Sequence, residues 1–161
     1  MQRCRNYFFS VVGFVAVAVS IPRAAEVEFG RVAGQWREAE SFDRISEYFG
    51  GGENRGGQVV VRTHADLRPG YYFLVRVSDA SALTGAKFEL SVIRPDAPEA
   101  KTFTLPAEAH KGGTVFVLGL TGTDWPGGGK ANPVAWKLTL LAADGHPLAE
   151  QKSFLWEKPA K

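Results

Sequence analysis

Side chains that could do chemistry are few in this sequence of 161 residues. The three histidines are His64, His110 and His146, and none has a second histidine or a cysteine at the spacing of metal ligands. A zinc site needs three or four such ligands that converge, so we expect no metal site. The segment His64-Ala65-Asp66 indicates a turn, in which Asp66 accepts a backbone hydrogen bond.

Motifs for phosphate binding and hydrolysis are incomplete or missing. The glycine-rich stretch 50–57 lacks the Gly-Lys-Ser/Thr ending of a phosphate-binding loop, and in the stretch 127–130 Lys130 is followed by Ala131, which has no hydroxyl for magnesium. No Gly-x-Ser-x-Gly elbow occurs. Glu38 and Glu40 form one of many possible acidic pairs among 17 acids. We therefore expect no catalytic residue, no cofactor and no enzymatic activity.

Tryptophan offers the better candidate for a binding role. Trp136 and Trp156 are in register with expected core positions, whereas Trp125 lies in a loop rich in glycine and proline, residues 121–127. That composition predicts a surface position, where the ring could stack on a sugar or anchor a protein partner. Trp36 and Tyr48 are the further ligand-binding candidates. In the alternative interpretation Trp125 folds back over one open end of the fold.

The first 25 residues resemble an export signal. Met1 to Asn6 is short and basic, the run 7–21 is uncharged and mostly apolar, and Pro22-Arg23-Ala24-Ala25 precedes a change of composition at Glu26. Ala18 and Ser20 also suit a cut, so the cleavage position stays open. An uncleaved anchor is the alternative, but 15 apolar residues fall short of the ~20 that span a bilayer. We predict a periplasmic or secreted protein with no membrane span in its mature part.

Removal of this leader changes the charge and the redox chemistry of the chain. Arg3, Arg5 and Arg23 leave with it, so residues 26–161 carry 16 basic and 17 acidic residues. The resulting net charge of −1 gives no support to nucleic-acid binding, which needs clustered cations. Cys4, the single cysteine, also leaves, so the mature domain has no disulfide. The 136 remaining residues suffice for one domain with its own core.

The rest of the sequence predicts short strands separated by glycine and proline turns. Alternating apolar residues, often aromatic or β-branched, predict strands at 27–32, 59–63, 71–78, 88–92, 102–105, 114–120, 136–140 and 148–156. Both faces of 114–120 are apolar, as in a strand inside a sheet. Asp144-Gly145 predicts a hairpin turn. In the last strand the polar middle suits an exposed edge, and Phe154 and Trp156 are expected to point inward. Ser41 to Phe49 predicts one short helix.

This pattern predicts an all-β protein, a two-sheet antiparallel β-sandwich of seven to eight strands resembling the immunoglobulin or fibronectin type III architecture. Residues 41–49 and 68–76 also resemble segments of uncharacterised secreted bacterial proteins. Neither resemblance implies an activity. The functional expectation is a non-catalytic binding or adaptor module whose partner is another envelope or secreted protein, reached through loops or by strand addition at 148–156. The alternative is a carbohydrate-binding module that uses Trp125, Trp36 and Tyr48.

Overall fold

The computed structural model describes residues 27–42, 58–80, 83–108 and 112–157. The expected leader at 1–25 and the glycine-rich loop at 50–57 lie outside these residues, and so does the expected helix after Phe42. The first of the 3-10 turns, η1 (Ala39–Phe42), precedes that gap.

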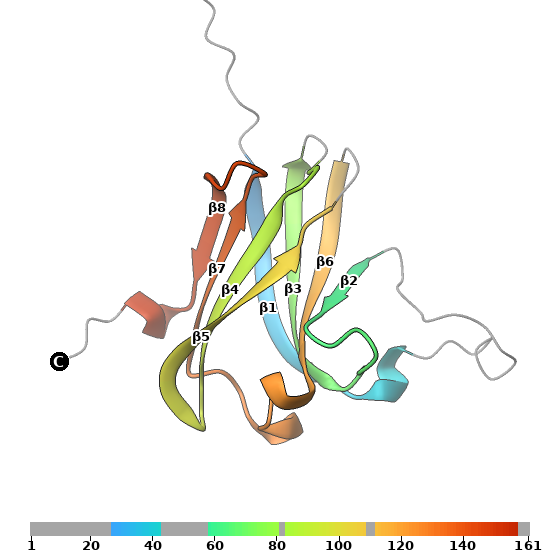
Figure 1. The fold of residues 1–161 in the computed structure, drawn as a ribbon, viewed down its shortest axis with the longest axis vertical. Helices are drawn as coiled ribbons and strands as arrows, with labels where there is room; N and C mark the ends of the chain where they lie inside the picture. The colour runs from blue at the N-terminus through green and yellow to red at the C-terminus, as the bar shows by residue number, and fades with distance from the viewer. Residues whose placement is uncertain (1–26, 43–57, 81–82, 109–111, 158–161) are drawn as a thin grey trace, which may run out of the picture.

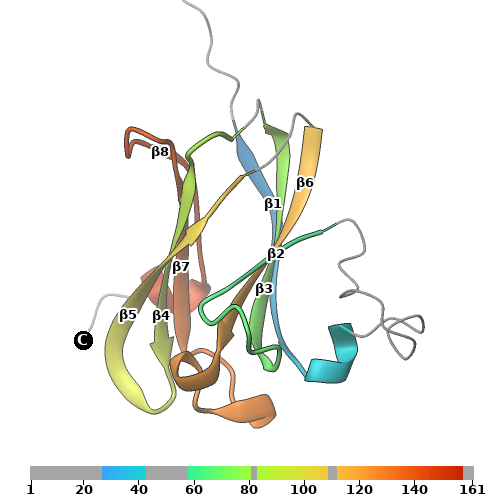
Figure 2. The same ribbon diagram turned by 45° about the vertical axis from the view of Figure 1, so that its right-hand side comes forward.

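Within these described ranges, eight strands form two four-stranded sheets that face each other, which confirms the predicted all-β sandwich (Figures 1 and 2). The first sheet has the order β1-β3-β6-β2 and the second has the order β5-β4-β7-β8. The strands are β1 (Glu28–Arg37), β2 (Val59–Arg62), β3 (Gly70–Ala80), β4 (Lys87–Arg94), β5 (Ala97–Pro106), β6 (Gly112–Thr121), β7 (Ala135–Leu141) and β8 (Pro147–Lys152). The short 3-10 turns η3 (Gly122–Asp124) and η4 (Gly128–Lys130) lie in the β6–β7 connection, and η5 (Phe154–Glu157) follows β8.

The strand order matches the immunoglobulin arrangement in all but one place. An immunoglobulin sheet places strands A, B, E and D side by side, and the other sheet places C, F and G together, with C′ added beside C in variable-type domains. Here β1, β3 and β6 take the places of A, B and E, and β5, β4, β7 and β8 take those of C′, C, F and G. The place of strand D is filled by β2.

The pairing of β2 with β6 is parallel, whereas the other strand pairs are antiparallel. The first sheet is therefore mixed rather than wholly antiparallel. Because β1 also runs in the direction of β6, β1 and β2 point the same way in this sheet. Parallel strands need a connection of about a dozen residues or more, and 21 residues separate β1 from β2.

The core lies between the sheets and follows the predicted alternation. Tyr71, Phe73, Val75 and Val77 of β3 are all buried in one cluster with Phe88, Leu90 and Val92 of β4 and with Phe116, Leu118 and Leu120 of β6. The rings of Phe88 and Phe116 meet edge to face across the two sheets, 4.9 Å apart.

A second, smaller cluster covers part of the outer face of the first sheet. Phe42 and Tyr72 are fully buried there with Val117, and their ring centroids lie 5.0 Å apart. The guanidinium carbons of Arg37 and Arg62 lie 3.9 and 4.6 Å from the centroid of the Phe42 ring. Both faces of β6 are therefore apolar because one packs in the core between the sheets and the other packs against Phe42 and Tyr72.

Gly119 of β6 allows Tyr72 to lie flat on the sheet. A β-carbon at this position would lie 2.4 Å from the Tyr72 ring, a separation that β-carbons in proteins essentially never show.

We expect Gly119→Ala to destabilise the protein by about 1–3 kcal/mol, as overpacking does. Urea unfolding of the full chain measures this. In Gly30→Ala the nearest atom to the new carbon is 3.3 Å away, so the loss should be clearly smaller. Equal losses in the two variants would contradict this account.

Candidate functional site

Trp125 does not lie at the surface, so the expectation of an exposed loop tryptophan is wrong. Its side chain is only 3% exposed and belongs to the main core cluster. The ring packs on the ring of Tyr71, with 4.7 Å between centroids, and its Nε1 donates a hydrogen bond to the carbonyl oxygen of Gly128 at 3.2 Å. The alternative interpretation therefore describes its position, because the loop folds back and closes one open end of the sandwich.

Trp36 lies near the same end, at the end of β1. It pairs with Tyr71 on β3, is half-buried against the core, and donates from Nε1 to Oε1 of Glu38 at 2.6 Å. Gly129 packs so closely on this ring that a β-carbon would lie 2.8 Å from it. The structure thus gathers Trp36 and Trp125 around one loop, but as packing partners of it. The third candidate, Tyr48, lies outside the described residues.

Tyr71 joins these aromatic residues to the loop. Its hydroxyl donates to Oδ1 of Asn132 at 3.3 Å, and burial raises the pKa of this hydroxyl above its ordinary value. The neutral, hydrogen-bonded hydroxyl of Tyr71 thus ties β3 to the loop that closes this end of the sandwich.

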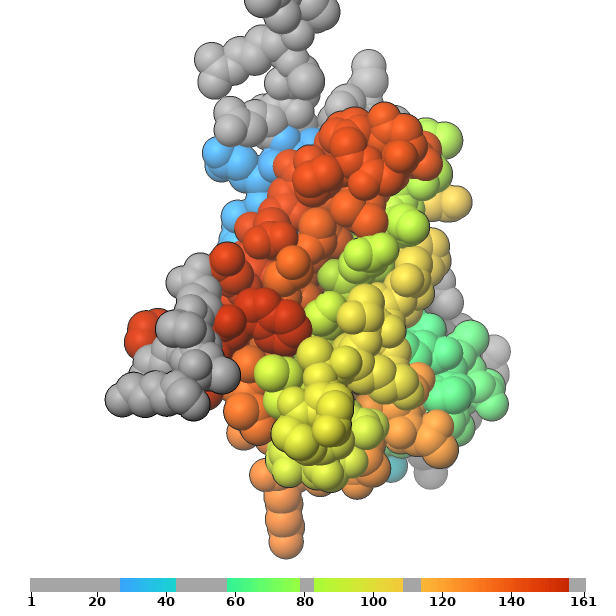
Figure 3. Space-filling model, turned by 60° about the vertical axis from the view of Figure 1, so that its left-hand side comes forward, coloured from blue at the N-terminus to red at the C-terminus, as the bar shows by residue number. Residues whose placement is uncertain are grey.

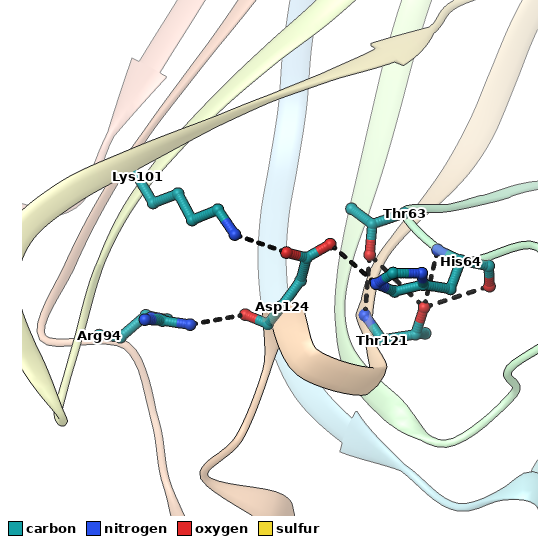
Figure 4. A network of polar contacts seen from close by, with 6 residues as sticks. All are labelled: Thr63, His64, Arg94, Lys101, Thr121 and Asp124. Atoms are coloured by element: carbon teal, nitrogen blue, oxygen red, sulfur yellow. Dashed lines mark hydrogen bonds and ion pairs between the residues drawn. The ribbon is translucent and has the colours of Figure 1, made fainter.

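A polar network, the Asp124 network, crosses between the sheets beside Trp125 (Figure 4). Oδ1 of Asp124 accepts a hydrogen bond from Nζ of Lys101 on β5 at 2.6 Å, and its backbone oxygen accepts one from Arg94 at 3.3 Å. Oδ2 of Asp124 lies 3.2 Å from Nε2 of His64. Nε2 is shielded from solvent and makes no hydrogen bond, so the two side chains are in close contact only. Lys101 and Arg94 belong to the second sheet, whereas His64 follows β2 of the first.

The charge of Asp124 is stabilised by its neighbours. Burial by itself would raise the pKa of Asp124, but hydrogen bonds from Lys101 and Thr63, together with the nearby side chains of Lys101 and His64, hold the pKa below its ordinary value. Thr63 and Thr121 complete the arrangement through reciprocal contacts: Thr121 donates from its backbone to Oγ1 of Thr63 at 3.1 Å, and Oγ1 of Thr121 accepts from the backbone of His64 at 3.0 Å. The network is built to hold β2, η3 and β5 together.

Sequence reasoning missed this network. It assigned His64 to a turn with Asp66, and the backbone does turn there, since Leu67 donates to the carbonyl oxygen of His64 at 3.2 Å. His64 contacts Asp124 because β2 pairs with β6, and no local sequence pattern predicts that pairing. Across the described ranges, no group of three or more histidine, cysteine, aspartate or glutamate side chains could hold a metal ion.

The edge strand β8 ends earlier than predicted. Ser153 donates from its backbone to the carbonyl oxygen of Trp136 at 2.8 Å, but Trp136 donates to the side-chain oxygen of Ser153 rather than to its carbonyl. The hydroxyl thus replaces the next ladder bond, and the chain turns into η5. The expectation that Phe154 points inward is wrong, because its side chain is 74% exposed. Trp156 is half-buried rather than buried.

Three exposed apolar side chains lie next to β7 and β8 in the sequence near this turn, and we call them the η5 patch: Val134, Phe154 and Leu155. Val134 is 48% exposed and Leu155 is 50% exposed. Because β7 and β8 run antiparallel and η5 packs against β7, the residue just before β7 lies beside the residues just after β8. Along β8 itself the surface is charged, with Glu150 between Lys137 at 3.3 Å and Lys152 at 3.8 Å. A short, charged edge with an apolar end is the result.

Comparison with known proteins found no matching family model, no matching curated protein and no matching solved structure. In the part of the chain that the structure describes, none of the helices has the length and apolar character needed to cross a membrane.

We expect Asp124→Asn to reduce stability in a pH-dependent way. The folded-state pKa of Asp124 is lowered, so its charge stabilises the fold above the unfolded-state value of about 4 and this stabilisation is lost as the pH falls through the folded-state pKa. The variant should be less stable by roughly 1 kcal/mol at pH 7, since Lys101 is half exposed, and the difference should shrink below about pH 4.

Urea unfolding of both proteins between pH 7 and pH 2 measures this difference. Glu89→Gln is the control, because Glu89 pairs with Lys87 on the same strand, β4, and both side chains are partly exposed. A difference between wild type and Asp124→Asn that stays constant with pH would rule out a role for the charge.

The buried position of Trp125 gives a prediction that separates packing from sugar binding. We expect Trp125→Ala to cost about 3–5 kcal/mol of stability, as loss of a core aromatic does. Polysaccharides should leave the tryptophan fluorescence of the wild-type protein unchanged. A fluorescence shift with a glycan that Trp125→Phe abolishes, in a protein as stable as wild type, would favour the carbohydrate-binding alternative instead.

Proposed function

We propose that this protein is an exported, non-catalytic adaptor module that holds another protein of the cell envelope or the secreted fraction. The export rests on the leader-like residues 1–25, and the absence of catalysis rests on the lack of a catalytic motif in the sequence. The observation that carries the binding role is the η5 patch at the end of the β8 edge.

The η5 patch has the composition of a protein-binding surface. Four large hydrophobic side chains of the described residues are exposed, and three of them, Val134, Phe154 and Leu155, belong to it. Exposed apolar side chains that lie singly need no explanation, but their gathering on one part of a surface is typical of an interaction site. An aromatic residue among them suits the central anchor of an interface.

The neighbouring strand extends this surface. The outer face of the second sheet is drawn in Figure 3, with β8 along one margin. The backbone of β8 pairs with β7 on one side, and the other edge of β8 lies near β1 of the first sheet. Glu150 and Lys152 protect the edge against indiscriminate pairing. A partner strand that added here would have to match these charges and would end with an apolar residue on the η5 patch, which gives the contact its specificity.

Photo-crosslinking in the cells that make the protein tests this proposal. A benzophenone amino acid at position 155 of the full chain should give one discrete product of defined mass, and Phe154→Ser should remove most of it. Because Phe154 is exposed, this substitution should change stability by no more than about 0.5 kcal/mol.

The matched control places the same crosslinker at Leu67, which is 40% exposed in the β2–β3 connection. It should not give the product. The same products from both positions, or a protein recovered only as a free monomer, would refute the adaptor proposal. A product of twice the mass of the chain would show self-association through the η5 patch in place of a foreign partner.

A further inference from the structure

A hollow with two arginines lies on the outer face of the first sheet, away from the η5 patch. We call it the arginine groove: it is lined by Arg31, Ala33, Leu74, Arg76 and Val115 and has a volume of 310 Å³. This size lies at the lower end of the range of small-molecule sites, about 300–1,000 Å³. Its residues come from β1, β3 and β6, next to one another in the sheet.

A β-bulge in β1 brings the two arginines together. Phe29 pairs with Val77 and Val32 pairs with Val75, so two residues of β1, Gly30 and Arg31, stand opposite the single residue Arg76. A bulge of this kind redirects a side chain that regular alternation would send elsewhere. Gly30 makes room for the second arginine, since a β-carbon at this position would lie 3.3 Å from Cβ of Arg76.

This juxtaposition does not serve the stability of the sheet. Like charges opposite each other on neighbouring strands are destabilising. Among the described residues no carboxylate forms an ion pair with Arg31 or Arg76, and the acidic residue of β1 on this face, Glu28, is exposed at the strand start opposite Ser78. A bound anion would relieve the repulsion, and guanidinium groups bind a carboxylate through two parallel hydrogen bonds.

The floor of the groove adds an apolar requirement. Ala33, Leu74 and Val115 are each half-buried and present methyl groups to the hollow. We propose that the arginine groove binds an aliphatic carboxylate, with the carboxylate on Arg31 and Arg76 and the hydrocarbon chain over Leu74 and Val115. A free phosphate would satisfy the charges but leave the apolar floor in water, and an uncharged alcohol would do the reverse. This site is independent of the adaptor proposal, because it lies on a different sheet.

Titration of the full chain with sodium octanoate, followed by two-dimensional amide NMR, tests the proposal. The amide signals of Ala33, Leu74 and Val115 should shift in a saturable way. Arg76→Gln and Arg31→Gln should each weaken binding by about tenfold, the expected loss of a charge-assisted hydrogen bond. Arg76→Lys, which keeps the charge but not the paired donors, should lose less.

Lys87→Gln is the matched control, since Lys87 is a half-exposed cation of β4 on the other sheet, and it should bind octanoate as the wild type does. Both groove arginines are exposed, so their variants should keep the wild-type spectrum elsewhere. The proposal is overturned if octanoate gives no saturable shift in the groove or if the arginine variants bind equally well. It is also overturned if octanol binds as tightly as octanoate, or if acetate or inorganic phosphate does.

Discussion

Side-chain packing between two sheets holds this protein together, and the rest of the structure depends on it. The described residues contain no cysteine, so no covalent link across the sandwich helps them. An immunoglobulin domain joins its sheets by a disulfide between strands B and F, with a tryptophan packed against it. Here the corresponding strands are β3 and β7, and they meet through the rings of Phe73 and Trp136, 5.7 Å apart. Aromatic packing thus occupies the place of the disulfide.

A sandwich without a crosslink must also prevent water from entering at its ends. The β6–β7 connection performs this task at one end, because it inserts Trp125 over Tyr71 and places Asp124 between Lys101 of the second sheet and His64, which follows β2 of the first. The apolar ring excludes water, and hydrogen bonds from Lys101 and Arg94 satisfy oxygens of Asp124, whose side chain is only 16% exposed. Packing and charge pairing come from adjacent residues, so the loop closes the fold as one unit.

The sequence predicted the parts of the fold that depend on local patterns. The alternation in Tyr71 to Ser78 identifies β3 and its inward face, and the apolar character of both faces of 114–120 identifies β6 as an inner strand. Contacts between residues far apart in the sequence could not be predicted from local patterns. The parallel place of β2 and the fold-back of Trp125 both depend on what lies opposite in space. The prediction that Phe154 points inward was wrong for a local reason. The Ser153 hydroxyl replaces the backbone acceptor for the Trp136 amide, so the strand and its inward–outward alternation end there.

The shape of the turns decides which surfaces can bind. In antibody variable domains the F–G loop is a main part of the binding surface. The corresponding β7–β8 connection is a tight turn, with Gly145 at φ 89° and a hydrogen bond from its amide to the carbonyl oxygen of Ala142 at 2.9 Å. Such a turn presents little surface, and its two exposed polar side chains, Asp144 and His146, pair with each other. The opposite end is occupied by the closing loop, so in the described part of the chain the η5 patch and the arginine groove present their exposed side chains at a strand edge and on a sheet face, away from both ends of the sandwich.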